Sequence, residues 1–407
     1  MARRTALALV LLTLPVAFVA QATARTTRAS VTITIWDGFS ASPRERAALN
    51  RVAQAWAERT GNRVVNAGDV NDRINEFRTA ARTGRGPDVI QLPHSNLGSL
   101  ARPGLLAPAP SGFVTRRNYD SVGVTAVTYE GRLFGLPIGR ETYFLYFNRE
   151  HVRAAPRTWR ALIATAKRLT NGERAGFLWD TANFYYAYNW VRGFGGYVFR
   201  VTPRGFDARQ LGINTPGGIR GLQFVQDLVQ HHKLVPAGTT SDVAESSFAT
   251  GRAAMIISGP WAARGFREGG VDFGAAPLPI LPNGKPSAPF VGVETLAVNR
   301  HSRNASTAWN LVRYLSARLP MPLFRASGRV PVLKSASASR AVQRNAVARA
   351  TIRASNNGEA LPNIPAMAHV WGPMGDQLQL VVEAKTTPAA AARSAQERIA
   401  RAIAQGG

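Results

Sequence analysis

The chain has 407 residues and a formal net charge of +26, yet 45% of its residues are hydrophobic and only 18% are charged. This balance argues against a disordered chain, and the length is sufficient for two domains with cores of their own. The sequence contains no cysteine, which excludes disulfides, thiolate metal sites, cysteine nucleophiles and a lipid anchor on an N-terminal cysteine.

Residues 1–24 have the features of a secretory signal peptide. Arg3 and Arg4 precede an apolar stretch over residues 6–20, and an A-x-A-like cleavage site follows at residues 22–24. The stretch is short for a membrane span, which needs about 20 apolar residues, and no later segment of the sequence is a better candidate. We therefore expect export to the periplasm or another extracytoplasmic location, with an uncleaved anchor as the alternative.

The mature chain begins with a pattern of alternating strands and helices. Residues 31–36 alternate apolar and polar side chains, which predicts a strand. Ser42 and Glu45 flank Pro43 in the spacing of a capping box, which predicts that a helix begins here. A strand near residues 63–65, a helix over 74–81 and a strand over 88–92 follow. Such alternation favours right-handed crossovers and a parallel sheet.

The second half of the chain continues this pattern. We expect Thr158, Thr215 and Ser241 to cap helices, and we expect Trp261 to emerge after a strand and a Gly-Pro turn. The further predicted elements are strands over 133–137 and 143–147 around a polar break at 139–141, an aromatic segment over 184–199, a strand over 253–257, and helices over 305–316 and 389–404.

The arginines and lysines are scattered along the chain and form no basic stripe. No nucleic-acid-binding motif accompanies them, so we expect no nucleic-acid partner and attribute the charge to a compositional bias. Attraction to an anionic membrane surface or an anionic ligand is the alternative. The six histidines lack the spacing of metal ligands, so we expect neither a metal nor a cofactor.

No long linker of low complexity divides the sequence, although its length is sufficient for two domains. A chain that crosses between two lobes more than once would need no such linker. Hinge closure about crossings of this kind is one way in which proteins trap a ligand.

Six stretches in this order resemble the family 1 extracellular solute-binding proteins of ABC importers, and within that family the maltose/maltodextrin-binding branch. The resemblance covers nearly all of the mature chain. The stretches are GRGPDVI at residues 84–90, GFGGYVF at 193–199, SGPWA at 258–262, PFVGV at 289–293, LPNIPAM at 361–367, and Trp371.

The resemblance implies a fold, a function and partners. The fold would be α/β, the type II periplasmic binding protein fold, with two lobes that each contain a parallel-dominated sheet flanked by helices. Residues 25–139 and 293–333 would form one lobe, and residues 143–289 and 340–407 the other, with crossing hinge segments and a ligand cleft between them. The protein would be a monomer and not an enzyme. It would capture a maltodextrin-type sugar by hinge closure and deliver it to permease subunits.

The resemblance also assigns site residues. Trp261 and Trp371 match stacking tryptophans of the family, Glu141 matches a carboxylate that accepts bonds from sugar hydroxyls, and Tyr185 matches an aromatic residue of the cleft wall. Each has a structural alternative: a core tryptophan, an ion pair between Glu141 and Arg140, or an aromatic helix that only fills the core.

Other positions depart from the maltose branch. Asn183 stands where the family has a carboxylate, Ser95 and Asn96 replace an Asp and an Arg, Leu92 replaces a tryptophan, and Gly372 replaces a tyrosine. Ser40 and Ala41 replace an Asp-Lys pair.

Asp37 lies at the end of the first strand and is our candidate to compensate for these losses. The departures keep trehalose, another sugar or an anionic ligand near Arg140 open as alternatives. A secreted glycosidase would need two facing carboxylates, for which Glu141 and Asp180 are the conceivable pair.

Overall fold

The computed structural model describes residues 30–39, 42–68 and 72–406. The predicted signal peptide and the pair Ser40–Ala41 lie outside these residues. The strands are β1 (Thr32–Trp36), β2 (Arg63–Gly68), β3 (Val89–Pro93), β4 (Thr128–Tyr129), β5 (Arg132–Leu133), β6 (Leu136–Thr142), β7 (Phe144–Asn148), β8 (Tyr197–Thr202), β9 (Gly205–Gly212), β10 (Met255–Ser258), β11 (Phe273–Ala276), β12 (Phe290–Val298) and β13 (Glu359–Ala360).

Helices connect most of these strands. The α-helices are α1 (Pro43–Thr60), α2 (Arg73–Arg82), α3 (Leu97–Ala101), α4 (Ser121–Ala126), α5 (Trp159–Leu169), α6 (Phe184–Gly193), α7 (Pro216–Gln226), α8 (Ser241–Ala249), α9 (Ala263–Glu268), α10 (Ala305–Arg318), α11 (Pro320–Ser327), α12 (Lys334–Ser337), α13 (Arg340–Arg344), α14 (Ala346–Asn357), α15 (Trp371–Val382) and α16 (Pro388–Gly406). Single turns of other helix types are η1 (His94–Asn96), η2 (Asp227–His231), η3 (Pro260–Ala262) and η4 (Pro365–His369).

The larger sheet has the order β13-β12-β3-β1-β2, and β6 also pairs with β12. β1 is parallel to both β2 and β3, as the alternation of strands and helices predicted. After each strand, α1 or α2 brings the chain back to the end of the sheet where that strand began, so the next strand runs in the same direction. β12 is parallel to β13 and antiparallel to β3 and β6. Ile33 and Ile35 of β1 are fully buried and pack in one core with Trp56 of α1 and Phe77 of α2.

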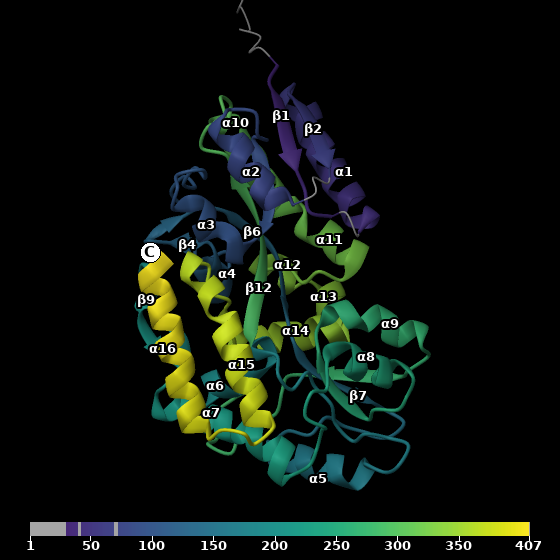
Figure 1. Cartoon of the computed structure of the whole chain (residues 1–407). Helices are drawn as coiled ribbons and strands as arrows, with labels where there is room; N and C mark the ends of the chain where they lie inside the picture. Colours follow the sequence, from purple (N-terminus) through teal and green to yellow (C-terminus); the bar gives the residue numbers. More distant parts are fainter. Residues whose placement is uncertain (1–29, 40–41, 69–71, 407) are drawn as a thin grey trace, which may run out of the picture. The chain divides into compact units, whose positions relative to one another are not determined.

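The polar break that we predicted at residues 139–141 is wrong, because these residues lie inside β6. Their backbone pairs with β12, where Arg140 is opposite Val293 and Glu141 is opposite Gly292. β6 and β12 run side by side in Figure 1. Only Tyr143 separates β6 from β7, so the chain passes from the larger sheet into the second sheet within one residue.

The second sheet has the order β10-β7-β11, with both outer strands antiparallel to β7. This differs from the expected predominance of parallel strands in each lobe. β10 and β11 are parallel to each other and are joined through η3 and α9, but they lie on opposite sides of β7. β7, which follows β6 of the larger sheet along the chain, therefore lies between β10 and β11 and runs in the opposite direction to both.

Two of the predicted helix caps are confirmed and two are wrong. The side chains of Thr158 and Thr215 accept hydrogen bonds from the first turns of α5 and α7. α8 is capped by Thr240 rather than by Ser241. Ser42 makes no side-chain cap bond, and the carboxylate of Glu45 accepts hydrogen bonds from Ser327 and Arg329 instead of completing a capping box.

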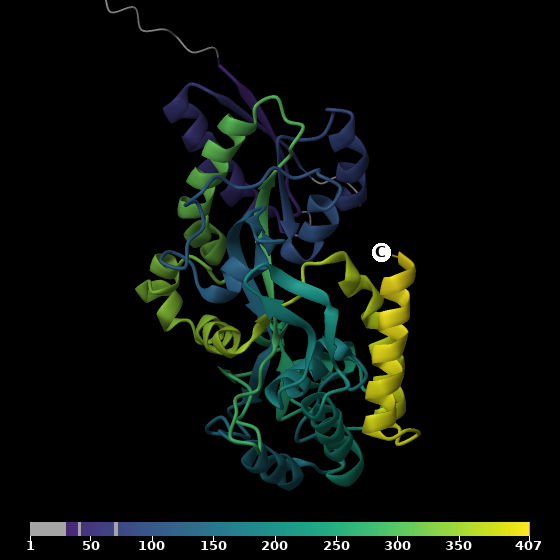
Figure 2. The same cartoon turned by 90° about the vertical axis from the view of Figure 1, so that its left-hand side faces the viewer.

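α15 and α16 lie side by side and antiparallel, as both views show (Figures 1 and 2). α15 also contacts α6, so Trp371 at the start of α15 and the aromatic residues of α6 come from neighbouring helices. Within residues 30–39, 42–68 and 72–406, no helix combines the length and the hydrophobicity needed to cross a bilayer.

Candidate functional site

Four of the eight predicted site residues line one pocket of about 260 Å³, namely Ser95, Glu141, Tyr185 and Trp261. They come from η1, β6, α6 and η3, so the larger sheet, a helix and two short helical turns contribute to the site. The remaining lining residues are Pro93, His94, Gly292, Val293, Glu294 and Leu361.

Trp261 is held over the pocket by the turn that follows β10. Its side chain is 44% exposed, and its Nε1 donates a hydrogen bond of 3.1 Å to Glu245. Ser258 donates to the same carboxylate oxygen at 2.6 Å. The indole ring folds back over Gly259, where an added Cβ would lie 2.1 Å from the ring. Glu245, which the sequence analysis missed, therefore fixes the orientation of an exposed aromatic face.

Glu141 offers the pocket a carboxylate that has no partner within the described chain. Among the described residues, none forms a hydrogen bond or ion pair with it, and its side chain lies against Gly292, where a Cβ would come within 3.0 Å of Glu141 Cγ. Burial and the charge of Glu141 together raise the pKa of the Tyr185 phenol well above its ordinary value. A hydroxyl donor of a ligand could therefore bond this carboxylate without displacing a group of the protein.

Glu294 is a second carboxylate of the pocket that the sequence analysis did not find. It lies in β12 opposite Gly139 and receives a hydrogen bond from the Gln91 amide. Its oxygen is 3.8 Å from the Arg329 guanidinium. Burial raises the pKa of Glu294, whereas the charge of Arg329 opposes that shift. No signal in the sequence marked Glu294, because it lies within a predominantly apolar strand.

His94, in η1, lines the pocket and is uncharged at neutral pH. Its Nδ1 accepts a hydrogen bond of 3.0 Å from the Val293 amide, and its Nε2 lies 2.8 Å from the Leu361 carbonyl. Nε2 therefore carries the proton. Burial lowers the pKa of His94 to about 4, so it adds no positive charge to the site at neutral pH.

The aromatic segment divides between core and site. Tyr186 and Tyr188 are buried, and Tyr188 stacks on Phe290 at 3.5 Å, whereas half-buried Tyr185 lines the pocket. Trp371 is 37% exposed and lies outside the lining of this pocket, but its ring is 6.3 Å from that of Phe290. The Tyr185 ring is also 6.3 Å from that of Phe290, so this one buried ring lies close to both Tyr185 and Trp371.

The other predicted residues are not brought to the pocket. Asp37 is fully buried, and its carboxylate accepts hydrogen bonds from Arg46, Asn66 and the Phe39 amide, which lower its pKa although burial opposes this. Asn183 caps α6 through its side-chain oxygen.

Asn96 ends η1 and is not among the residues that line the pocket. Asp37 and Asn183 are therefore committed to the fold, and we withdraw Asp37 as the residue that compensates for the family's lost polar contacts.

The residues of the rival functions are likewise committed to the fold. Arg140 is buried and pairs with Asp120, while its other terminal nitrogen donates to Ser337 at 3.2 Å. It therefore offers no cation to an anionic ligand of the pocket. Asp180 accepts a hydrogen bond of 2.8 Å from Ser241 and is not among the lining residues.

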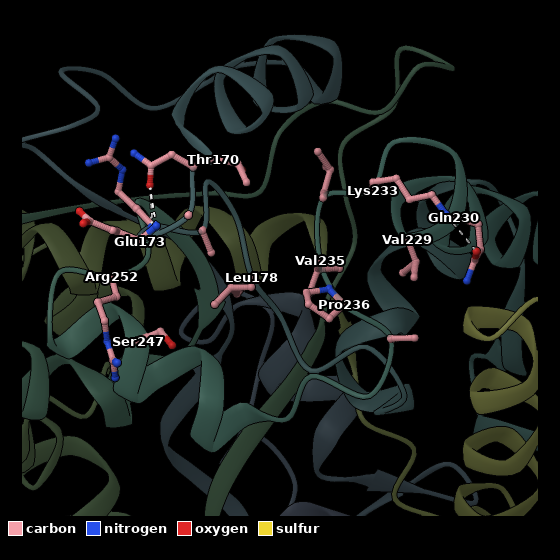
Figure 3. Close-up of a pocket in the computed structure, with 16 residues that line it drawn as sticks. Thr170, Glu173, Leu178, Val229, Gln230, Lys233, Val235, Pro236, Ser247 and Arg252 are labelled. Atoms are coloured by element: carbon pink, nitrogen blue, oxygen red, sulfur yellow. Dashed lines mark hydrogen bonds between the residues drawn. The ribbon is translucent and has the colours of Figure 1, made fainter.

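A larger hollow of about 640 Å³ lies elsewhere, near the end of α5 and the segment that follows α7 (Figure 3). Its labelled side chains include Glu173, Lys233 and Arg252. Among the described residues that line it, none is aromatic, and none is a predicted site residue. The smaller pocket beside Trp261 is therefore the better candidate for a sugar site.

Two sheets between which the chain passes at β6–β7 and again at β11–β12, with an aromatic and carboxylate pocket beside β6 and β12, define a two-lobed binding protein of the type II periplasmic class. The sequence profile of the family described as bacterial extracellular solute-binding protein matches residues 51–350. The chain belongs to this family.

Relatives and solved structures agree with this assignment. The galactooligosaccharide-binding protein of Bacillus subtilis is 31% identical over 80% of this chain and 79% of its own length. A cyclo/maltodextrin-binding protein solved with maltotetraose has a TM-score of 0.87 and 26% identity, covering 91% of this chain and 97% of the other. The maltose-maltodextrin binding protein of Alicyclobacillus acidocaldarius has a TM-score of 0.77 and 32% identity, covering 90% of this chain and 99% of the other.

Proposed function

We propose that this protein captures a short, neutral oligosaccharide of the maltose or maltodextrin class and delivers it to the permease subunits of an ABC importer. The observation that carries the proposal is the pocket in which Trp261 and Tyr185 lie beside the carboxylate of Glu141, which pairs with none of the described residues. Aromatic faces cover the C–H faces of pyranose rings, and a carboxylate accepts strong hydrogen bonds from hydroxyls. The maltotetraose bound to one structural neighbour supports the same ligand class.

The size of the pocket suggests how such a ligand would lie. Its volume of about 260 Å³ is below the roughly 300–1,000 Å³ of pockets that enclose a drug-sized ligand. We infer that one sugar ring occupies the pocket beside Trp261 and that the next ring extends toward the exposed face of Trp371. A chain of two or more units would then contact both tryptophans.

Capture would proceed by closure, without chemistry on the sugar. The proposed lobes are residues 25–139 with 293–333 and residues 143–289 with 340–407, and the hinge would lie where β6 leads into β7 and where β12 begins. Glu141 and Glu294 would hold the ligand from this hinge region, and Trp261 and Tyr185 from the second lobe. A ligand that contacts both lobes shifts the population toward the closed form.

The proposal includes export of a monomeric protein after removal of residues 1–24. The family is extracellular, which supports a site of action outside the cytoplasm. A carrier that diffuses between its ligand and a permease needs no oligomeric partner.

The test is titration calorimetry of the mature protein with maltotriose, trehalose, a galactooligosaccharide and glucose 6-phosphate. We expect maltotriose to bind most tightly and to be recovered unchanged. Tighter binding of the galactooligosaccharide would assign the ligand class of the Bacillus subtilis relative instead. Binding of the phosphate alone, or hydrolysis of any of the sugars, would overturn the proposal.

A further inference from the structure

The pocket beside Trp261 is acidic, although the chain as a whole has a formal charge of +26. Glu141 and Glu294 both line it, and among its described lining residues there is no lysine or arginine. His94 is neutral at pH 7, since burial lowers its pKa to about 4. The charge next to a ligand is therefore opposite in sign to the charge of the whole molecule.

The groups behind the lining do not reverse this sign. Besides burial, which raises the pKa of Glu294, the charges of Arg329 and Arg73 lower it and those of Glu141 and Glu45 raise it. Glu245 adds a carboxylate behind the Trp261 indole.

The Asp37–Arg46 pair is neutral as a unit. Together with Glu294 itself, the described groups named here are four carboxylates and two guanidinium groups, so that carboxylates are the more numerous.

Strand register places the two lining carboxylates on one face. In the antiparallel pair β6–β12, Glu141 is opposite Gly292 and Glu294 is opposite Gly139. Residues two apart on a strand point to the same face, so the two glutamates are diagonal neighbours with roughly 7 Å between their Cβ atoms. Each stands opposite a glycine, and the missing side chains leave room for Glu141 itself over Gly292 and for Arg329 beside Gly139.

The aromatic residues complete a site of recognisable chemistry. Trp261 and Tyr185 line the same pocket, and the faces of aromatic rings attract cations. Two carboxylates with an aromatic face satisfy a protonated amine better than a hydroxyl, because each hydrogen bond then joins opposite charges.

We infer that the Glu141–Glu294 pair makes this pocket prefer an oligosaccharide that carries a protonated amine over the neutral sugar of the same size, and reject one that carries a carboxylate. This inference rests on the proposed sugar-binding function and specifies its ligand further. The excess of positive charge on the chain predicts the opposite preference, so the two expectations are separable.

The test compares four ligands at pH 7 by titration calorimetry: maltotriose, two derivatives in which the C6 hydroxyl of one terminal unit is an amine, and a derivative oxidised to a carboxylate at C6. We expect one aminated sugar to bind about tenfold more tightly than maltotriose, and the carboxylate at least about tenfold more weakly, as for one charge-assisted hydrogen bond gained or lost. In E294Q and E141Q the preference for the amine should fall about tenfold. E268Q is the matched control, because Glu268 forms an exposed ion pair with Arg264 on α9.

The outcomes separate this inference from the function on which it rests. Maltotriose binding at least as tight as both aminated sugars would overturn the inference and leave the proposed function standing. An amine preference that both E294Q and E141Q retain would overturn the role of the pair. Loss of folding in E294Q leaves E141Q as the test, because no described group of the protein bonds Glu141. If none of the sugars binds, both proposals fail.

Discussion

At the scale of single residues, the candidate site combines one exposed indole with the Glu141 carboxylate, to which no described residue forms a hydrogen bond or ion pair. Trp261 loses little by being exposed, because its Nε1 is bonded to Glu245 and its ring packs over Gly259. Glu141 is held in a strand, so its carboxylate needs little further ordering when a ligand binds. Pre-ordered groups of this kind improve affinity because less conformational entropy is lost on binding.

We predict that Trp261→Ala weakens maltotriose binding at least tenfold and leaves the melting temperature nearly unchanged. The exposed face removes apolar surface from water only when a sugar covers it, which is worth about 1.5–3 kcal/mol. Trp371→Ala should have a smaller effect, because that indole lies outside the pocket. Calorimetry with maltotriose measures both variants, and Trp261→Ala binding as tightly as the unchanged protein would remove this residue from the site.

His94 should make the fold sensitive to acid. Its pKa is lowered from 6.5 to about 4, so the unfolded chain takes up a proton that the folded chain rejects as the pH falls below 6.5. The stability that neutral His94 contributes is therefore complete above pH 6.5 and is lost between pH 6.5 and about 4, by roughly 3 kcal/mol in all.

Urea unfolding at pH 7 and pH 4.5 tests this prediction. His94→Gln should lose roughly 2–3 kcal/mol less than the unchanged protein between these two values. Equal losses in the two proteins would mean that His94 is not protonated on unfolding in this range.

At the scale of secondary-structure elements, an ion-pair network joins α1, α11 and β12. Arg329 donates to Glu45 at 2.6 Å and lies 3.8 Å from Glu294, and Ser327 donates to Glu45 at 2.7 Å. Gly139 gives Arg329 room, since a Cβ there would lie 2.6 Å from its side chain. The network ties the first helix of the chain to the strand that carries a pocket carboxylate.

We predict that Glu45→Ala destabilises the protein by about 3 kcal/mol, because it leaves the Arg329 guanidinium with one carboxylate fewer in a buried place. Glu268→Ala, which breaks the exposed pair with Arg264, should cost less than about 1 kcal/mol. Urea unfolding of both variants gives the comparison. Similar losses for the two would show that the buried network adds nothing to stability.

This network also shows where prediction from the sequence ends. Local patterns were sufficient for α1, α2, α5 and α7, because apolar spacing, and in α5 and α7 also a capping threonine, is encoded within one element. The bond between Arg329 and Glu45 joins residues 284 apart, and no local pattern indicates it. The capping box at Ser42 was wrong for that reason, since Glu45 was already engaged elsewhere.

The candidate site could likewise be predicted only where a local pattern marks its residues. Trp261, Glu141, Tyr185 and Ser95 could be placed because a strand end or a family motif marks each of them. Glu294 and Glu245 could not, because one lies in a mainly apolar strand and the other on the side of a helix. Their roles depend on which strand or turn lies opposite, which only the tertiary structure determines.

At the scale of the whole molecule, the proposed mechanism requires a change of conformation that the ligand drives. A ligand shifts an equilibrium only by the difference between its affinities for the two states. To convert a mostly open population into a mostly closed one, from 1:99 to 99:1, the closed form must bind about 10⁴-fold more tightly. Contacts from one lobe alone cannot supply that difference, whereas Trp261 with the hinge-region carboxylates could.

We therefore predict that saturating maltotriose reduces the radius of gyration of the mature protein, measured by small-angle X-ray scattering. Trp261→Ala at a sugar concentration that saturates it should close less completely, because it loses a contact that the second lobe contributes. Glu268→Ala should close as the unchanged protein does, since its ion pair with Arg264 is exposed and Glu268 is not among the residues that line the pocket. A radius of gyration that is unchanged while calorimetry records saturation would mean that the sugar binds without closure, and delivery to a permease would then need another signal.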